Sequence, residues 1–216
     1  MKIIVAGDVH AEWGVLNAMI ARQKPDILLQ CGDFGWWPKD KLYPIKIKNG
    51  NCEIYWCDGN HEDHASLAKL KTTLVKPNVR YMPRASVLPL PDGRNVLFMG
   101  GAFSIDWRRR IDRFNWFREE ELINQRDLDL LDYIDRKIDI VVSHTCPKTF
   151  MDQKDLFYSY RMIEPCNYAL DIVLEKFKPD LWYFGHFHKY ATGQYENTKW
   201  TALSMARETN WWEELE

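Results

Sequence analysis

The chain has 216 residues, of which 46% are apolar and 28% are charged, as is usual for a globular protein. Its net charge of −2 provides no overall field to hold nucleic acid, so any basic surface must be local. The apolar runs are far shorter than the roughly 20 residues of a membrane span, and Gly7-Asp8 interrupt the N-terminus too early for a signal peptide. The five cysteines show no CxxC spacing, so we expect reduced thiols and a cytoplasmic protein without membrane contact.

The first part of the sequence alternates short apolar runs with segments of helical spacing. Residues 2–6, 27–29 and 53–57 predict buried strands, each followed by a glycine. Residues 11–22 carry apolar side chains at helical spacing, and residues 64–70 predict a second, shorter helix. This alternation is typical of an α/β protein.

The middle of the sequence has a different pattern. Residues 79–82, 87–90 and 96–99 form short apolar runs separated by proline and glycine, which predicts strands joined by tight turns and paired antiparallel. Residues 125–136 then show helical spacing, with charged side chains on the other face.

The last part returns to alternating strands and helices. Residues 138–143 and 181–184 predict buried strands on either side of a helix over residues 168–177, for which Asn167 is the expected N-cap. Residues 190–203 predict a closing hairpin. We find no linker, repeat or low-complexity tract, and therefore expect a single α/β domain over residues 1–216 with layered sheets.

Polar side chains that can bind metals follow five of the strand-like runs. In open α/β sheets the carboxyl ends of the strands line one crevice, so residues distant in sequence can meet there. Spacing of two residues in an extended segment also places both side chains on one side. The residues concerned are Asp8, His10, Asp33, Asn60, His61, His144, His186 and His188.

Carboxylate, imidazole and amide donors without a thiolate suit borderline divalent cations such as Mn²⁺, Fe²⁺ or Zn²⁺. One carboxylate can bridge two such ions about 3.5–4 Å apart, as in two-metal hydrolysis. A role in capping turns would explain Asp8 or Asn60 alone, but not the ordered set with five of the six histidines. His64 is the remaining histidine, and we expect it to pack or to lie at the surface.

The motifs GDVH at 7–10, GD at 32–33, GNHE at 59–62, the single His144 and GHFH at 185–188 occur in this order along nearly the whole chain. Together they resemble the motifs of the calcineurin-like metallophosphoesterases. The resemblance implies a four-layer α/β/β/α sandwich of mixed sheets with helices on the outside. It also implies a hydrolase that uses two divalent cations and attacks a phosphoester with a metal-bridging hydroxide.

The resemblance further implies a role for each residue of the motifs. Asp33 would bridge the two cations, and His61 would protonate the leaving oxygen. One cation would be bound by Asp8, His10 and His188, and the other by Asn60, His144 and His186.

The sequence departs from one branch of this family. The GDxxDRG motif of Ser/Thr protein phosphatases is replaced by GDFGWW at residues 32–37, so the Asp-Arg pair that positions the catalytic histidine there is absent. Ala11 is a smaller departure, because many members have glycine after the histidine of the first motif. We therefore do not expect a protein phosphatase, and the residue that orients His61 is not identified by the sequence.

An arginine-rich segment follows Gly100-Gly101 and resembles the corresponding loop of some bacterial and phage members. One guanidinium group can donate two parallel hydrogen bonds to two oxygens of a phosphate. This segment could therefore bind the substrate beside the cations. Arg110 is the first candidate, with Arg109 and Arg113 as further ones. The alternative is a solvated, charged turn.

Three functions are compatible with these features. The first is hydrolysis of a phosphodiester, a nucleotide or a nucleic-acid end. The second uses the same chemistry on a phosphomonoester or a dinucleoside polyphosphate, because the sequence does not show the walls of the pocket. The third is a non-catalytic scaffold that has lost its metals, which the complete set of motif residues disfavours.

Overall fold

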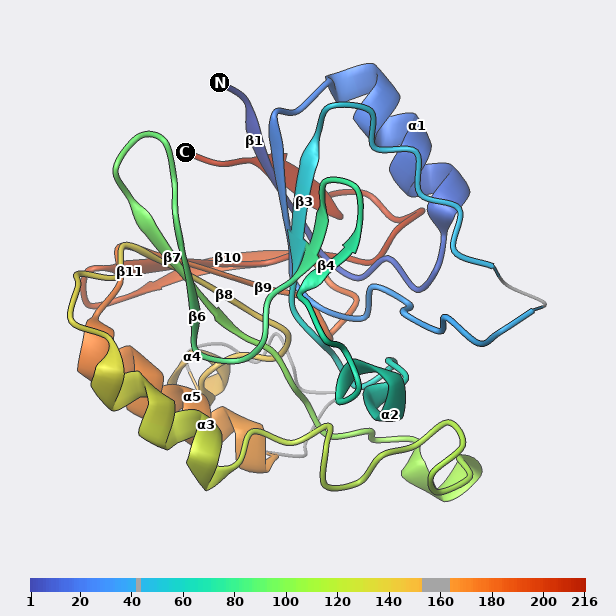
Figure 1. Cartoon of the computed structure of the whole chain (residues 1–216). Coiled ribbons are helices and arrows are strands. Elements are labelled where there is room, and N and C mark those ends of the chain that lie inside the picture. The colour runs from blue at the N-terminus through green and yellow to red at the C-terminus, as the bar shows by residue number, and fades with distance from the viewer. Residues whose placement is uncertain (42–43, 153–163) are drawn as a thin grey trace.

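The computed structural model describes residues 1–41, 44–152 and 164–216. Two six-stranded sheets pack against each other, and helices cover their outer faces (Figure 1). Side chains of both sheets, such as Val5 and Leu29 from one and Phe98 and Val142 from the other, form one buried apolar cluster. The molecule is therefore a sandwich whose central core lies between the sheets.

The first sheet has the strand order β12-β1-β2-β3-β5-β4. Strands β1, β2, β3 and β5 are parallel, whereas β4 and β12 pair antiparallel at the two edges. The bounds are Ile3–Ala6 for β1, Ile27–Gln30 for β2, Glu53–Trp56 for β3, Leu74–Lys76 for β4, Val79–Tyr81 for β5 and Trp212–Glu214 for β12.

The second sheet has the order β10-β11-β9-β8-β7-β6. Strands β7, β8, β9 and β11 are parallel, and β6 and β10 are the antiparallel edges. The bounds are Ser86–Pro89 for β6, Asn95–Met99 for β7, Ile140–Ser143 for β8, Leu181–Phe184 for β9, Ala191–Tyr195 for β10 and Thr198–Ala202 for β11.

The helices lie outside the sheets (Figure 1). Helix α1 buries Leu16 and Ile20 against the first sheet, and α5 buries Leu170 and Val173 against the second. The helices are α1 (Trp13–Gln23), α2 (His64–Leu67), α3 (Gln125–Asp129), α4 (Lys148–Asp152) and α5 (Pro165–Phe177), with 3₁₀ turns at Trp107–Arg109 and Leu130–Tyr133. The expected α/β class and its four layers are thus confirmed.

Two local predictions were wrong, those of the strand pairing at 79–82 and of the Asn167 cap, and the helix at 125–136 was confirmed only in part. The strand at 79–82 does not pair with the strand at 87–90, because β5 joins the first sheet parallel to β3 while β6 belongs to the second sheet. The helix at 125–136 is a short α-helix continued by a 3₁₀ turn. Asn167 lies inside α5, where its side-chain oxygen accepts the backbone N–H of Glu164, the actual N-cap.

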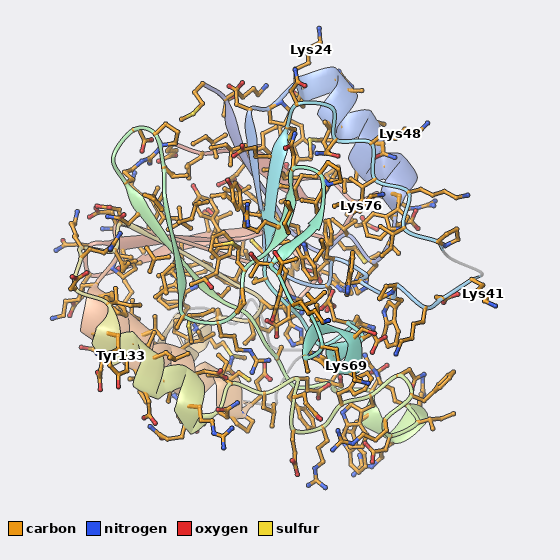
Figure 2. The ribbon with its side chains drawn as sticks, viewed as in Figure 1. Lys24, Lys41, Lys48, Lys69, Lys76 and Tyr133 are labelled. Carbon is orange, nitrogen blue, oxygen red and sulfur yellow. The ribbon has the colours of Figure 1, made fainter. Side chains whose placement is uncertain are left out.

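The parallel strands of the first sheet end near α2, which follows β3 along the chain (Figure 1). Lys24, at the end of α1, projects from the opposite end of that sheet (Figure 2). The motif residues follow the strands and therefore lie at the end of the sheet near α2. Every helix of the described residues is too short or too polar to span a lipid bilayer.

Candidate metal centre

The carboxyl ends of parallel strands in both sheets supply the residues of the site. Asp8, Asp33 and Asn60 follow β1, β2 and β3 of the first sheet, whereas His144 and His186 follow β8 and β9 of the second. The sandwich brings these ends together, so the expected residues meet in one place despite separations of up to 180 positions, as between Asp8 and His188. They form two adjacent clusters.

The first cluster contains Asp8, His10, Asp33 and His188, whose candidate ligand atoms all lie within 4.8 Å of one another. The Nε2 atoms of His10 and His188 are 3.0 Å apart. The Nε2 atom of His188 is 2.9 Å from Asp8 Oδ2, and that of His10 is 3.6 Å from Asp33 Oδ2. Two imidazole nitrogens and two carboxylates therefore face a common centre.

The second cluster is arranged around the side-chain oxygen of Asn60. Asn60 Oδ1 lies 3.1 Å from His144 Nε2 and 3.1 Å from His186 Nδ1. The Nδ1 atom of His144 is 2.8 Å from the backbone oxygen of Cys31, which can accept its proton and leave Nε2 free to bind a cation. His144 Nε2 is also 3.4 Å from Asp33 Oδ1.

Asp33 lies between the two clusters and faces each with a different oxygen. Its Oδ2 atom is directed at His10, and its Oδ1 atom at His144. Oδ1 also accepts the backbone N–H of His61 at 2.8 Å. The Asp33 side chain is only 2% exposed, so its charge must be compensated within the site.

Glycines make this close approach possible. A Cβ atom on Gly185 would lie 2.0 Å from Asp8 Oδ1, and one on Gly32 would lie 2.6 Å from His144 Nδ1. Gly32 also has a φ of +88°, which side chains disfavour. The site itself contains strained backbone, because His10, Asp33, His186 and His188 all have positive φ values.

The charges of the site offset each other. Burial opposes ionisation of Asp8, but the neighbouring His10 and His188 outweigh it and hold the pKa of this carboxyl well below its usual range. Burial likewise acts against protonation of His10 and His144, yet Asp33 and Asp8 raise their pKa values to about 9 and about 10. The two buried carboxylates therefore demand positive charge, which protons or cations can supply.

These residues fit a pair of divalent cations. Nitrogen and oxygen donors without a thiolate are the set that Mn²⁺, Fe²⁺ and Zn²⁺ accept. Asp8 Oδ2 is buried and makes no hydrogen bond of good geometry with any described residue, as expected of an atom reserved for a ligand. The fit rests on Asp8 and Asp33 together, because a pair of cations would compensate both buried carboxylates in place of the protonated histidines.

His61 lies beside the clusters and is the most accessible of the motif residues that contact Asp33. Its side chain is 40% exposed, and its Nε2 atom is 4.0 Å from Asp33 Oδ2. Arg110 Nη2 lies 2.6 Å from the same Nε2 atom, and Arg110 Nη1 donates to the backbone oxygen of Asn60 at 3.0 Å. Asp106 accepts from Arg110 Nε at 2.6 Å. An arginine from another part of the chain, itself paired with Asp106, thus contacts His61.

The three candidate arginines have different surroundings. The Arg110 side chain is 6% exposed and points at His61, whereas Arg109 is exposed. Arg113 forms an ion pair with Glu120, and its side chain is 62% exposed. Arg110 is therefore the one arginine of the three that the structure brings to the two clusters.

Glu62 is a functional candidate to which the sequence alone assigned no role. Its two oxygens accept the backbone N–H groups of Gly35, at 3.0 Å, and Gly59, at 2.6 Å. It therefore ties together the loops that carry Asp33 and Asn60. The only sequence signal was its place after His61 in the GNHE motif.

His64 lies outside both clusters, as expected. It is buried, and its Nε2 atom is 3.1 Å from the backbone oxygen of Gly59. Its side chain therefore packs beneath the loop that carries Asn60.

Comparison with known proteins agrees with this geometry. Residues 1–190 match the family model described as calcineurin-like phosphoesterase. A comparison with curated proteins gives no significant match.

Solved structures share the fold. Protein TT1561 of Thermus thermophilus is similar with a TM-score of 0.60 at 12% identity, over 99% of this chain and 97% of that one. The phosphopantetheinyl hydrolase PptH of Mycobacterium tuberculosis has a TM-score of 0.55 at 11% identity, over 99% and 96% of the two chains. A novel archaeal phosphodiesterase has a TM-score of 0.50 at 11% identity, over 100% and 99%.

Proposed function

The chain belongs to the calcineurin-like phosphoesterase family and is a phosphoric ester hydrolase, and from this premise we propose that it cleaves a phosphodiester or a nucleotide. Two divalent cations would be held by the two clusters, with Asp33 shared between them. The proposed ligands are Asp8, His10 and His188 for the first cation, Asn60, His144 and His186 for the second, and Asp33 for both.

One observation carries the proposal: Asp33 faces both clusters at once, with Oδ2 toward His10 and Oδ1 toward His144. A carboxylate in this position is suited to bridge two cations. The complete set of donors also disfavours a non-catalytic scaffold, which would have no use for two buried carboxylates.

When bound, the cations supply positive charge for the phosphoryl oxygens and lower the pKa of a coordinated water. The chain's own residues would position the ester. Arg110 Nη2 lies beside His61 Nε2, so a phosphoryl oxygen at this point could accept from both groups.

His61 would donate a proton to the leaving oxygen. Burial lowers the pKa of its imidazole, Asp33 opposes this effect, and Arg110 adds to it. The lowered pKa favours the neutral imidazole at neutral pH, so His61 would act as the acid from the fraction of the protein in which it is protonated.

Two observations favour a diester or a nucleotide as the substrate. One protein of similar fold is described as a phosphodiesterase and another as a phosphopantetheinyl hydrolase. The GDFGWW sequence at 32–37 lacks the protein-phosphatase motif, which favours a small substrate. Phosphomonoesters and dinucleoside polyphosphates are the alternative substrates for the same site.

The test is turnover of a chromogenic diester and the matching monoester by protein stripped of metal and then supplied with Mn²⁺, Fe²⁺ or Zn²⁺. We expect metal-dependent hydrolysis with the diester preferred, and about two cations bound per chain. Asp33→Ala should lose the cation pair and the turnover together. Cation binding without hydrolysis of either ester would contradict the proposal, and a preference for the monoester would select the alternative substrates.

A further inference from the structure

Glu164 is a buried carboxylate next to the second cluster that none of the motifs includes. It is the N-cap of α5 and is 5% exposed. Its Oε2 atom accepts the backbone N–H of Phe103, which lies in the segment after β7, and the Thr145 hydroxyl also interacts with the carboxyl. Its Oε1 atom is buried and makes no hydrogen bond of good geometry with any described residue. The imidazole of His186 faces this oxygen, with Nε2 at 3.7 Å.

The two nitrogens of His186 face in different directions. Nδ1 points at Asn60 Oδ1, at 3.1 Å, and so at the second cluster, whereas Nε2 points at Glu164. A neutral imidazole has one N–H and one lone pair, so it can bind a cation through Nδ1 only if the proton is on Nε2. The proton then needs an acceptor on the side where Glu164 lies.

We propose that Glu164 is a positioning residue for His186, whose Oε1 accepts the Nε2–H and selects the tautomer that presents Nδ1 to the second cation. This inference rests on the proposed function, because it assumes that the second cluster binds a cation. Histidines that bind metals usually donate their other N–H to a carboxylate or a backbone oxygen. His144 already has such a partner in the backbone oxygen of Cys31.

Only a carboxylate can accept a hydrogen bond from both of the N–H groups that face Glu164. Phe103 offers an N–H to one oxygen of Glu164, and the His186 tautomer that binds the cation offers an N–H to the other. A glutamine has one oxygen that accepts and one NH₂ group that only donates. Its NH₂ group must therefore face either the N–H of Phe103 or the N–H of His186, with which it cannot form a hydrogen bond. If it keeps the bond from Phe103, its NH₂ group faces Nε2 and favours the wrong tautomer of His186.

Glu164→Gln tests this role with almost no change in volume. The first cation should bind with unchanged affinity, whereas the second should bind about 10- to 100-fold more weakly, the usual effect of removing such a partner. Isothermal titration with Mn²⁺ measures both steps, and electron paramagnetic resonance detects the loss of the coupled Mn²⁺ pair. Glu175→Gln is the matched control, because this glutamate lies exposed on the same helix.

Wild-type affinity for both cations in Glu164→Gln would overturn the inference and leave the proposed function intact. A wild-type chain that binds no cation pair would overturn the proposed function itself. Nitrogen-15 NMR of the wild-type protein loaded with diamagnetic Zn²⁺ provides a second measurement that does not depend on how well the variant folds. We expect His186 Nε2 to carry a proton with the downfield shift of a hydrogen bond to a carboxylate, and an Nε2–H without that shift would refute the role of Glu164.

Discussion

Each side chain of the site has a distinct electrostatic task, which follows from its burial. Asp8 and Asp33 are almost fully buried and must remain paired with positive charge, whereas His61 is partly exposed and can reach a substrate. Arg110 contacts His61 and pairs with Asp106, which accepts from its Nε atom. Binding of cations and handling of the substrate are therefore assigned to separate residues.

His61→Ala should separate these two tasks. We expect the variant to keep both cations, because no proposed ligand is removed, and to hydrolyse esters with poor leaving groups about 10²- to 10⁴-fold more slowly. Esters with a good leaving group should lose much less rate, since they need less protonation. Steady-state kinetics on both kinds of ester are the measurement. An equal loss for both would show that His61 does not act as the acid.

Arg110→Ala should weaken the handling of the phosphate. A lost charged hydrogen bond is worth about 1.5–3 kcal/mol, so we expect kcat/KM to fall by about 10- to 100-fold while cation binding is unchanged. Arg109→Ala is the matched control, because Arg109 is a neighbouring but exposed arginine. Kinetics of Arg110→Ala that equal those of Arg109→Ala would contradict a role for Arg110 in substrate binding.

At the scale of elements, the segment between β7 and α3 is attached to the metal-site loops through Arg84. This arginine forms ion pairs with Asp58 at 2.7 Å and with Asp127 at 3.0 Å, and its side chain is 8% exposed. It also donates to the backbone oxygen of Glu120 at 2.7 Å. Asp58 precedes Gly59 and Asn60, so Arg84 connects the segment that carries Arg110 to the loop that carries a proposed ligand.

Arg84→Ala should be strongly destabilising. Removing one partner of a buried ion pair leaves an uncompensated charge, which costs about 3–5 kcal/mol of the free energy of unfolding. Arg94→Ala is the control: its pair with Asp92 is about one-third exposed and should contribute at most about 1 kcal/mol. Urea unfolding at neutral pH measures both. Similar losses in the free energy of unfolding of the two variants would contradict the larger contribution expected of the buried ion pair.

The stabilisation of the fold by the Arg84–Asp58 ion pair should depend on pH. Burial would raise the pKa of Asp58, but Arg84 and the other partners lower it overall. A carboxyl whose pKa is lower in the folded state stabilises the fold above its unfolded pKa of about 3.9 and loses this contribution as the pH falls further. The difference between wild type and Arg84→Ala should therefore be largest at neutral pH and shrink in acid.

At the scale of the whole molecule, the site joins the two sheets. The first sheet supplies Asp8, Asp33 and Asn60, and the second supplies His144 and His186. A cation held by residues of both sheets binds the folded state and not the separated strands. Cation binding should therefore stabilise the entire sandwich against unfolding.

Mn²⁺ at about 100 times its Kd should add about 2.7 kcal/mol of stability per site, and so raise Tm by about 5–10 °C for each. Thermal unfolding followed by circular dichroism, with and without a chelator, is the measurement. Asp33→Ala should show almost no such increase. An unchanged Tm for the wild type at saturating Mn²⁺ would contradict a cation site shared between the sheets.

The sequence by itself determined the α/β class and the residues that meet in the site. Strand-like runs that end in glycine and then Asp, Asn or His are a local pattern, and parallel strands bring such ends together. Tertiary structure alone decided that β5 joins the first sheet, that Arg110 contacts His61 across 49 positions, and that Glu164 faces His186. These contacts depend on how separate segments pack, which no local pattern of hydrophobicity or spacing records.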